Sequence, residues 1–414
     1  MNKVQTLKGF RDLLPSEMML RNYVKNTLIE TFQNFAFLPL ETPALEYAST
    51  LKGKYSDETD QKLGYFFKDN GDRQVGLRYD LTVPVAKVLA IYSNQIQLPF
   101  KRYQIQTVWR AENTQKGRYR EFTQCDIDTF GSTSPLTESE IISLIYQATK
   151  KLNIKNALLK VNDRNILSGI LNDAKIDKEQ ENTTLQSLDK IDKIGEERVK
   201  KELKNKGLST SQITSLFKYI KEAQPSQQLQ KIFSQLEALN IPKSFYTFDP
   251  TLIRGCDYYT GPIFELTVKD TKISSLGGGG RYDQLIKTLG GPDIPAVGFS
   301  FGFERIVDFI KDNKLYSQQE KTKTKVMIAN FGSETEKNIL QLASQFQNDS
   351  IPYFLYPNDD KLSKQIKTAL ALNIPYLAII GTEESENKTI TLKNLDKKEQ
   401  KTIKLEELLT ILNK

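Results

Sequence analysis

The chain has 414 residues, of which 58 are basic and 51 acidic, and its formal net charge is +7. This length predicts two or three domains, and no apolar run reaches the roughly 18–20 residues that a membrane span needs. The start shows no apolar signal segment and the two cysteines are far apart, so we expect a cytoplasmic protein without a disulfide framework. There is no histidine, which excludes imidazole bases and predicts no metal site built from histidine or cysteine.

Helical spacing of apolar residues and turn signals divide the first third of the chain into elements. Asn70-Gly71 predicts the turn of a hairpin, and Thr82 is expected to cap a helix with Pro84 in its first turn. The basic segment 113–120 is expected to join two long strands. The elements expected here are a helix over about 17–36, a strand within 37–47 that ends at Pro43, a hairpin over 65–78, a helix within 80–92 and two strands within 101–131.

The rest of the chain changes character twice. Residues 165–240 are charged, glycine-poor and helical in pattern, which predicts a helical insertion. Strand patterns return over 244–279, and the apolar stripe of "FERIVDFIKDN" predicts a helix after the strand "AVGFSFG". Residues 316–325 have the polar character of a linker, and strand and helix patterns alternate beyond them. This alternation predicts a small α/β domain with a mostly parallel sheet.

One face of the second long strand carries an unusual set of side chains. Side chains alternate between the two faces of a strand, so Phe122, Gln124, Asp126 and Asp128 share one face. An aromatic ring, an amide and two acids are unusual in a core and would suit the floor of a ligand site. The alternative is a solvated sheet face beside a basic surface loop, and the pattern alone leaves both interpretations open.

Three further segments have two interpretations each. The four glycines in "SLGGGGRYDQLI" allow close approach to a ligand, with a following helix that presents its N-terminus to an anion, or they form a tight strand-to-helix turn. In "RGCDYYTG", Arg254 held by Asp257 would leave two tyrosine hydroxyls for a ligand, or all four side chains are packed in the interior. Arg305, in the first turn of its helix, suits a phosphate ligand as well as a surface position.

The order of these segments is more specific than any one of them. The chain runs from "GFRDLLP" through "LRYDLT" to "VWRAENTQKGRYREFTQCDIDTFG", and later come "RGCDYYTG", "GGGGRYDQL" and "VGFSFGFERI". The series resembles the class II aminoacyl-tRNA synthetases over essentially the whole chain, and "RGCDYYTG" with "GGGGRYDQL" is similar to the signature segments of the histidyl-tRNA synthetases. The resemblance implies an α+β fold: a catalytic domain over 1–320, with an antiparallel sheet flanked by helices and a helical insertion at about 165–240, and an anticodon-binding α/β domain over 321–414.

The resemblance also implies roles for individual residues. The side chains implied to bind ATP are Arg110, Glu112, Phe122 and Arg305. Those implied to hold the substrate histidine are Asp80, Thr82, Gln124, Asp128, Arg254, Tyr258, Tyr259 and Tyr282. Arg254 and Arg110 would be catalytic, because both would contact the α-phosphate at which the reaction takes place. The residues implied to meet the acceptor end of the tRNA are Gln115, Lys116 and Arg118.

The implied reaction is the ATP-dependent activation of L-histidine to histidyl-adenylate, followed by transfer to the terminal adenosine of the histidine tRNA. The carboxylate attacks the α-phosphorus in line and needs no base, so arginines and Mg²⁺ would supply positioning and neutralise charge. The resemblance also implies a homodimer. The alternative functions are a non-catalytic synthetase-like regulator and an RNA-binding sensor module. Arg110, Arg254 and Arg305 are all present, together with a C-terminal domain, which argues against the regulator. The compact length and the complete set of motifs argue against the sensor module.

Some observations are left over. Asp126 has the parity of the site floor, but the resemblance gives it no role. Asp80 and Asp128 stand where some members of the family carry glutamate, so a shifted backbone or a water would have to make up the missing length. The absence of histidine has two explanations, compositional drift or selection for an enzyme that can be made while histidine tRNA is uncharged. Histidine content across proteins from the same source would separate them.

Overall fold

The computed structural model describes residues 4–52, 63–114, 119–253, 258–269, 271, 275–316 and 322–413. The chain divides into two compact units. The larger consists of Met1–Leu13 with Val24–Leu315, and the smaller consists of Leu14–Tyr23 with Tyr316–Lys414. None of the helices in the described part of the chain combines the length and the apolar character that crossing a membrane requires.

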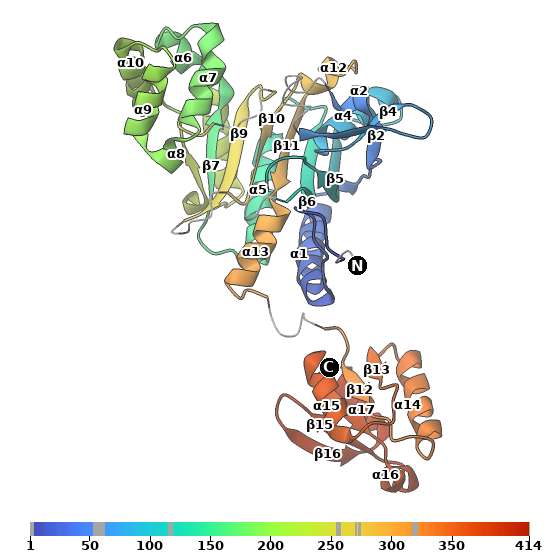
Figure 1. Cartoon of the computed structure of the whole chain (residues 1–414). Helices are drawn as coiled ribbons and strands as arrows, with labels where there is room; N and C mark the ends of the chain where they lie inside the picture. Colours follow the sequence, from blue (N-terminus) through green and yellow to red (C-terminus); the bar gives the residue numbers. More distant parts are fainter. Residues whose placement is uncertain are drawn as a thin grey trace. The chain divides into compact units, whose positions relative to one another are not determined.

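The larger unit is built on an eight-stranded sheet (Figure 1) whose strand order is β1-β5-β6-β11-β10-β9-β7-β8. Neighbouring strands are antiparallel, except for the parallel pairs β1–β5 and β7–β8 at the two edges. The strands are β1 (Leu38–Pro39), β5 (Phe100–Trp109), β6 (Glu121–Phe130), β7 (Ala157–Asp163), β8 (Tyr246–Phe248), β9 (Pro262–Val268), β10 (Gly277–Arg281) and β11 (Ala296–Phe301). The predicted antiparallel sheet of an α+β fold is confirmed.

Helices cover one face of this sheet with an apolar layer. Phe32 of helix α1 (Pro15–Asn34) is fully buried, and its ring centroid lies 5.6 Å from that of Tyr103 on β5 and 5.5 Å from that of Phe301 on β11. Helices α5 (Leu136–Lys151) and α13 (Phe303–Asp312) pack against β11 and β6, respectively. Because side chains alternate along a strand, the polar residues of β6 lie on the opposite face.

A small second sheet and a short helix lie before the long strands. β2 (Leu45–Tyr47), β4 (Gln74–Leu77) and β3 (Tyr65–Lys68) form this sheet in the order β2-β4-β3, next to α2 (Ala48–Leu51). The predicted hairpin is confirmed, and the Asp69 carboxylate closes its turn by accepting from the backbone N–H of Gly71 at 2.9 Å and of Arg73 at 3.0 Å. The strand predicted to end at Pro43 is present as the short β1, whereas β2, after Pro43, belongs to the small sheet and was not predicted.

Helix α4 (Thr82–Tyr92) already includes Thr82, so Thr82 lies inside the helix and not at the cap position before it. The carboxylate of Asp80 accepts from the backbone N–H of Val83 at 3.0 Å and so satisfies one of the free amides of the first turn. The predicted capping role of Thr82 was therefore wrong, because Asp80 fills it.

The predicted helical insertion is confirmed. Its helices are α6 (Arg164–Asp173), α7 (Lys178–Leu188), α8 (Ile191–Ile194), α9 (Glu196–Asn205), α10 (Thr210–Glu222) and α11 (Gln227–Ala238). Ser209 begins α10 with a capping box, in which its hydroxyl accepts from the Gln212 backbone and the Gln212 side chain accepts from the Ser209 backbone. A 3₁₀ turn, η1 (Lys243–Phe245), leads from the insertion back to the sheet.

The smaller unit has a five-stranded sheet of order β13-β12-β14-β15-β16. Its strands are β12 (Val326–Ile328), β13 (Tyr353–Leu355), β14 (Tyr376–Ile379), β15 (Ile390–Asn394) and β16 (Glu399–Ile403), and its helices after Thr335 are α14 (Glu336–Asn348), α15 (Leu362–Ala371), α16 (Thr382–Asn387) and α17 (Leu405–Leu412). The first three strands in chain order are parallel, as predicted, whereas β15 and β16 add an antiparallel edge that the sequence analysis did not predict.

Candidate active site

A row of polar and small residues crosses the centre of the large sheet on one face. The register of β5 with β6 places Arg102 opposite Asp128 and Gln104 opposite Asp126. The register of β6 with β11 places Gly298 and Ser300 on the other side of the same two acids. Residues directly opposite each other in a sheet project from the same face, so these six share one surface. We call this surface the floor; it comprises Arg102, Gln104, Asp126, Asp128, Gly298 and Ser300, together with Gln124 and Phe122 further along β6.

The floor is not a solvated sheet face. Asp126 and Asp128 each expose only 4% of their surface, and Arg102 is fully buried. On the opposite face, Cys125 and Ile127 are completely buried in the apolar layer. Burial raises the pKa of the Cys125 thiol well above its ordinary value, so that thiol is a packing group and not a nucleophile. The interpretation of β6 as a ligand floor is therefore favoured over a surface strand.

Asp128 is held from two sides. Its Oδ2 atom lies 2.5 Å from Nη2 of Arg102, and its Oδ1 atom accepts a hydrogen bond from the Tyr282 hydroxyl. Burial, and then the negative charge of Asp128, raise the pKa of Tyr282 well above its ordinary value. The phenol therefore stays protonated at neutral pH and acts as a donor to the carboxylate.

The glycine run forms a strand and not the predicted strand-to-helix turn. Gly277 to Gly280 lie in β10, which ends at Arg281, and the next helix, α12 (Leu285–Thr288), starts only at Leu285. Gly280 lies opposite Gly298 of β11. A Cβ atom at Gly298 would lie 1.8 Å from Oδ1 of Asp128, and one at Gly280 would lie 3.0 Å from the Tyr259 ring. The glycines therefore leave room for the two side chains that flank this part of the floor.

Arg281 does not face the floor. Its Nε atom lies 2.7 Å from Oε1 of Glu138, and its Nη1 atom lies 3.1 Å from Oδ1 of Asp283. Further bonds go to the Ser132 carbonyl at 3.0 Å and to the Thr137 hydroxyl at 3.0 Å. This buried network ties β10 to the start of α5, so the role of Arg281 is structural.

Asp126 and Gln124 form a pair on the floor. The Gln124 Nε2 atom donates to Oδ2 of Asp126 at 2.7 Å. Burial raises the pKa of Asp126 to about 6, although the charge of Arg102 opposes this shift and the charge of Asp128 adds to it. Oε1 of Gln124 is buried and has no hydrogen-bond partner among the described residues. The floor thus carries a free acceptor atom.

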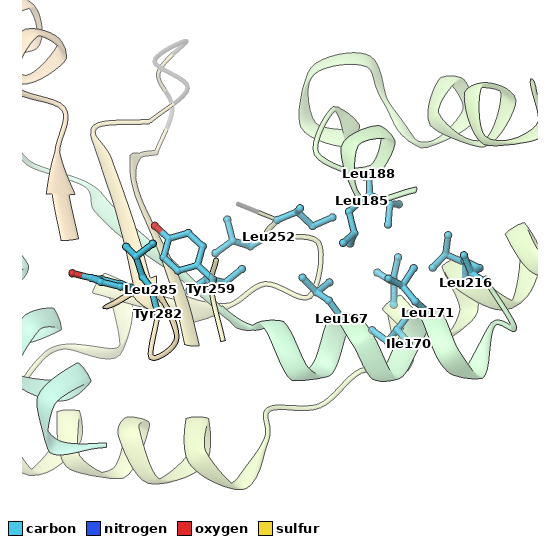
Figure 2. Close-up of a cluster of buried hydrophobic side chains, with 14 of the residues drawn as sticks. Leu167, Ile170, Leu171, Leu185, Leu188, Leu216, Leu252, Tyr259, Tyr282 and Leu285 are labelled. Atoms are coloured by element: carbon cyan, nitrogen blue, oxygen red, sulfur yellow. The ribbon is translucent and has the colours of Figure 1, made fainter. Parts of the chain in front are cut away.

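Three tyrosines form a wall beside the floor. The ring of Tyr258 lies 4.7 Å from that of Tyr259 and 5.7 Å from that of Tyr282, measured between centroids. Tyr259 and Tyr282 belong to the same buried hydrophobic cluster as Leu167 and Leu171 of the insertion. Figure 2 shows the hydroxyl ends of both tyrosines pointing away from those leucines. The insertion therefore supports the wall from behind, and the two hydroxyl groups lie on the side away from it.

Arg110 lies over the other end of the floor. Its guanidinium carbon is 5.2 Å from the ring centroid of Phe122, and its Nε atom donates to the Tyr79 carbonyl at 3.0 Å. Tyr79 is followed by the buried Asp80, so this bond links Arg110 to the corner between β4 and α4. The arrangement presents a cation above an aromatic ring, which suits a phosphate beside a planar base.

The remaining predicted site residues lie on elements that border the floor. Arg305, in the first turn of α13, donates from Nη1 to the Ser275 carbonyl at 2.9 Å, just before β10. Thr82, at the start of α4, and Glu112, after β5, are half-buried. Four predicted site residues lie outside the described residues, namely Arg254, Gln115, Lys116 and Arg118. Asp257, which was expected to hold Arg254, lies outside them too.

Sequence reasoning missed Arg102, which the resemblance does not single out. In an antiparallel hairpin the position numbers of opposite residues have a constant sum, so Arg102 falls opposite Asp128 only once the register of the two strands is known. In the described part of the chain, no group of three or more acidic or cysteine side chains could hold a metal ion.

The fold and the floor together define a class II aminoacyl-tRNA synthetase, as the sequence predicted. A family model described as histidyl-tRNA synthetase matches residues 9–306, and a model described as anticodon binding domain matches residues 325–414. The chain belongs to the histidyl-tRNA synthetase family and is, like the members of that family, an aminoacyl-tRNA ligase.

Individual relatives agree with this assignment. The chain is 39% identical to a histidine–tRNA ligase of Cytophaga hutchinsonii over 451 aligned positions that cover 99% of each protein. The crystal structure of histidyl-tRNA synthetase from Nostoc sp. PCC 7120 is 26% identical and superposes with a TM-score of 0.88 over 100% of this chain and 99% of that one.

The fold alone does not separate a ligase from a regulator. A Bacillus halodurans structure described as an ATP phosphoribosyltransferase regulatory subunit/histidyl-tRNA synthetase is 20% identical and has a TM-score of 0.72, over 88% of this chain and 96% of that one. The separation comes from the sequence, since the match to the ligase of Cytophaga hutchinsonii spans the whole chain. The regulatory alternative is therefore not favoured.

Proposed function

We propose that this chain charges the histidine tRNA in two steps at the floor. L-Histidine reacts with ATP to give histidyl-adenylate and pyrophosphate, and the histidyl group then passes to the terminal adenosine of the tRNA. The observation that best supports a histidine pocket is the buried Asp128, held between Arg102 and Tyr282. Such a carboxylate can accept from an imidazole N–H, and it would be left unpaired by an apolar amino acid, which makes the pocket discriminating.

The substrate histidine is held at three points. Asp128 and Tyr259 read the two imidazole nitrogens, and Tyr258 and Tyr282 complete the wall around the ring. The α-ammonium group lies against the acceptors of Gln124, Asp80 and Thr82. Two of these three residues, Gln124 and Asp80, are buried, and burial strengthens a charge-assisted hydrogen bond to an ammonium group. The carboxylate then points toward the ATP end of the floor.

ATP lies at the Phe122 end of the floor. Phe122 stacks on the adenine and Glu112 lies near it, while Arg110 binds the α-phosphate and Arg305 the γ-phosphate. The separation of the guanidinium from the Phe122 ring supports this arrangement, because the base and the α-phosphate of one nucleotide must be bound side by side. Arg254 bridges the substrate carboxylate and the α-phosphate, where it stabilises the charge that develops as pyrophosphate leaves.

Mg²⁺ enters as part of the MgATP substrate. The described residues provide no carboxylate cage, and Mg²⁺ bound to phosphates needs few protein ligands. The transfer step needs an acceptor for the ribose hydroxyl proton, and an oxygen of the substrate phosphate fills that role. Neither acid of the floor is assigned as this base. Asp126 already accepts from Gln124, and Asp128 is held by Arg102 and Tyr282.

The division of labour follows the chain. Residues 1–320 carry out both chemical steps, Gln115, Lys116 and Arg118 meet the acceptor end of the tRNA, and residues 321–414 bind the anticodon. The last segment contains 14 lysines and 12 acidic residues, so its tRNA contacts are local and not a broad basic field. We place the reaction in the cytoplasm and expect the active form to be a homodimer.

Histidine-dependent exchange of pyrophosphate into ATP tests the first step. The wild-type chain should catalyse the exchange with histidine and not with other amino acids. Arg110→Ala and Arg305→Ala should lower it about 100-fold or more, since each removes a charge from the phosphates. Arg198→Ala, on an exposed face of α9, is the matched control and should leave the rate unchanged. Exchange that survives Arg110→Ala at the wild-type rate would refute the assignment, and a wild-type chain without exchange would refute the function.

A further inference from the structure

We infer that Asp126 is a positioning residue, which fixes the Gln124 amide in the orientation that presents Oε1 to the α-ammonium group of the substrate. The inference rests on the proposed function, because it assumes that this ammonium group is bound at Gln124. It gives a role to an acid on the floor that the family resemblance leaves without one.

The geometry of the pair carries the argument. Asp126 and Gln124 are two positions apart on β6 and therefore project from the same face. Nε2 of Gln124 donates to Oδ2 of Asp126 at 2.7 Å, so Oε1 must point away from the carboxylate. Oε1 is buried, and it has no hydrogen-bond partner among the residues that the structure describes. A buried acceptor of this kind awaits a donor, and the ammonium group of an amino acid is one.

A glutamine amide needs such a partner because its two ends have nearly the same shape. Rotation of the amide by half a turn exchanges the acceptor Oε1 for the donor Nε2. Two donors, the ammonium group and Nε2, would then face each other. An ionised carboxylate accepts only, so it can pair with Nε2 and never with Oε1. Asp126 thus selects one of the two orientations before the substrate arrives, which lowers the cost of binding.

Asp126 is itself held in place by the sheet. Ser300 lies directly opposite it on β11, and Gln104 lies opposite it on β5. The positive charge of Arg102 favours the ionised form against the cost of burial, and the pKa of about 6 leaves the carboxylate mostly ionised at neutral pH. The acceptor-only state that the argument requires is therefore the prevailing one under ordinary assay conditions.

A double-mutant cycle tests the inference through the Michaelis constants of the exchange reaction. Asp126→Ala should raise the KM for histidine about 10- to 100-fold, the range expected when a hydrogen bond to a charged group is lost, while the KM for ATP stays within about twofold. Gln124→Ala should have a similar effect. The double variant should be no worse than Gln124→Ala alone, because Asp126 acts only through Gln124. An unchanged KM for histidine in Asp126→Ala, or losses that multiply in the double variant, would overturn the inference.

Two further variants separate orientation from folding and charge. Asp126→Leu fills the same space without an acceptor and replaces the alanine variant if that variant does not fold. Asp126→Asn offers an acceptor to Nε2 but also a donor to Oε1, so it no longer selects one orientation of the amide, and the KM for histidine should stay raised. If Asp126→Asn had the wild-type KM for histidine, no acceptor-only partner would be needed and the inference would be wrong.

Binding of substrate analogues distinguishes this inference from the proposed function. Histidinol keeps the ammonium group, whereas imidazolepropionate lacks it, and calorimetry measures the binding of both without catalysis. Asp126→Ala should weaken histidinol and leave imidazolepropionate unchanged; equal weakening of both would overturn the inference. A wild-type chain that binds neither histidine nor histidinol would instead overturn the proposed function on which the inference rests.

Discussion

The guanidinium of Arg102 lies 2.5 Å from the carboxylate of Asp128, and both side chains are almost completely buried. Asp126 lies one pleat away on the same face, so one arginine offsets the charge of two buried acids. The pair is therefore the electrostatic centre of the floor. Arg102 lies on β5 and Asp128 on β6, and the register between these two strands brings them together.

Removing this cation should destabilise the fold. Arg102→Met leaves Asp128 and Asp126 without a buried counter-charge, so the free energy of unfolding should fall by about 3–5 kcal/mol. Chemical denaturation monitored by tyrosine and tryptophan fluorescence measures the change. Lys68→Met breaks an exposed pair with Asp72 and serves as the control, with an expected loss below about 1 kcal/mol. Equal losses in the two variants would contradict the central role of Arg102.

The Tyr282 hydroxyl should matter for substrate affinity more than for folding. Tyr282→Phe removes the donor to Asp128, so the carboxylate is oriented less well, and the KM for histidine should rise about tenfold with little change for ATP. Tyr246→Phe is the matched control, because the Tyr246 hydroxyl is buried with no hydrogen-bond partner in the described part of the chain. Steady-state exchange kinetics compare the two, and a shift in the KM for ATP as large as that for histidine would count against the assignment.

Gly298 should tolerate no side chain. A methyl group there would lie 1.8 Å from Oδ1 of Asp128 and force the carboxylate away from its partners. Gly298→Ala should lower stability by about 1–3 kcal/mol and raise the KM for histidine at least about tenfold. Gly169→Ala, in an exposed position of α6 with nothing near its Cβ, should instead add about 0.5–1 kcal/mol. Thermal unfolding measures the stability of both variants, and exchange kinetics measure their KM for histidine. If Gly298→Ala behaved like the wild type, the floor would have room for a methyl group and the prediction would be wrong.

Asp126 should make stability depend on pH. Its pKa is raised from 3.8 to about 6 in the folded protein, so the folded state binds this proton more tightly than the unfolded state. The contribution of Asp126 is then fully present below about pH 4 and is lost as the pH rises through about 6. Asp126→Asn, uncharged throughout, should be more stable than the wild type by up to about 3 kcal/mol near pH 7.5, with the difference vanishing near pH 4. Denaturation curves at both pH values measure it; a difference that grows toward acid would have the wrong sign.

The sequence predicted the floor only as far as local periodicity reaches. Alternation along β6 correctly placed Gln124 and Asp128 on one face, because the pleat of a strand is a property of neighbouring residues. It said nothing of Arg102 on β5, whose contribution depends on the register between two strands. Long strands joined by a loop of uncertain length do not fix that register from composition or pattern.

The glycine run shows a second limit. Four glycines have the local signature of a turn, yet Gly277 to Gly280 form a strand, since tertiary contacts with β9 and β11 decide their conformation. The helix cap was likewise predicted at Thr82, whereas the side chain of Asp80, two residues earlier, accepts from the backbone N–H of Val83. In both places the short segment is compatible with two local conformations. The surrounding structure selects one of them, so the segment alone does not predict the outcome.

The packing behind the tyrosine wall ties the pocket to a distant stretch of the chain. The rings of Tyr259 and Tyr282 and the leucines of the insertion belong to one hydrophobic cluster, so loosening the insertion should expose the back of the proposed imidazole pocket to water. We therefore expect selectivity for the amino acid to depend on the insertion helices as well as on the tyrosine wall, although the two are far apart in the sequence. A substitution in the core of the insertion should reduce the selectivity for the amino acid before it unfolds the insertion.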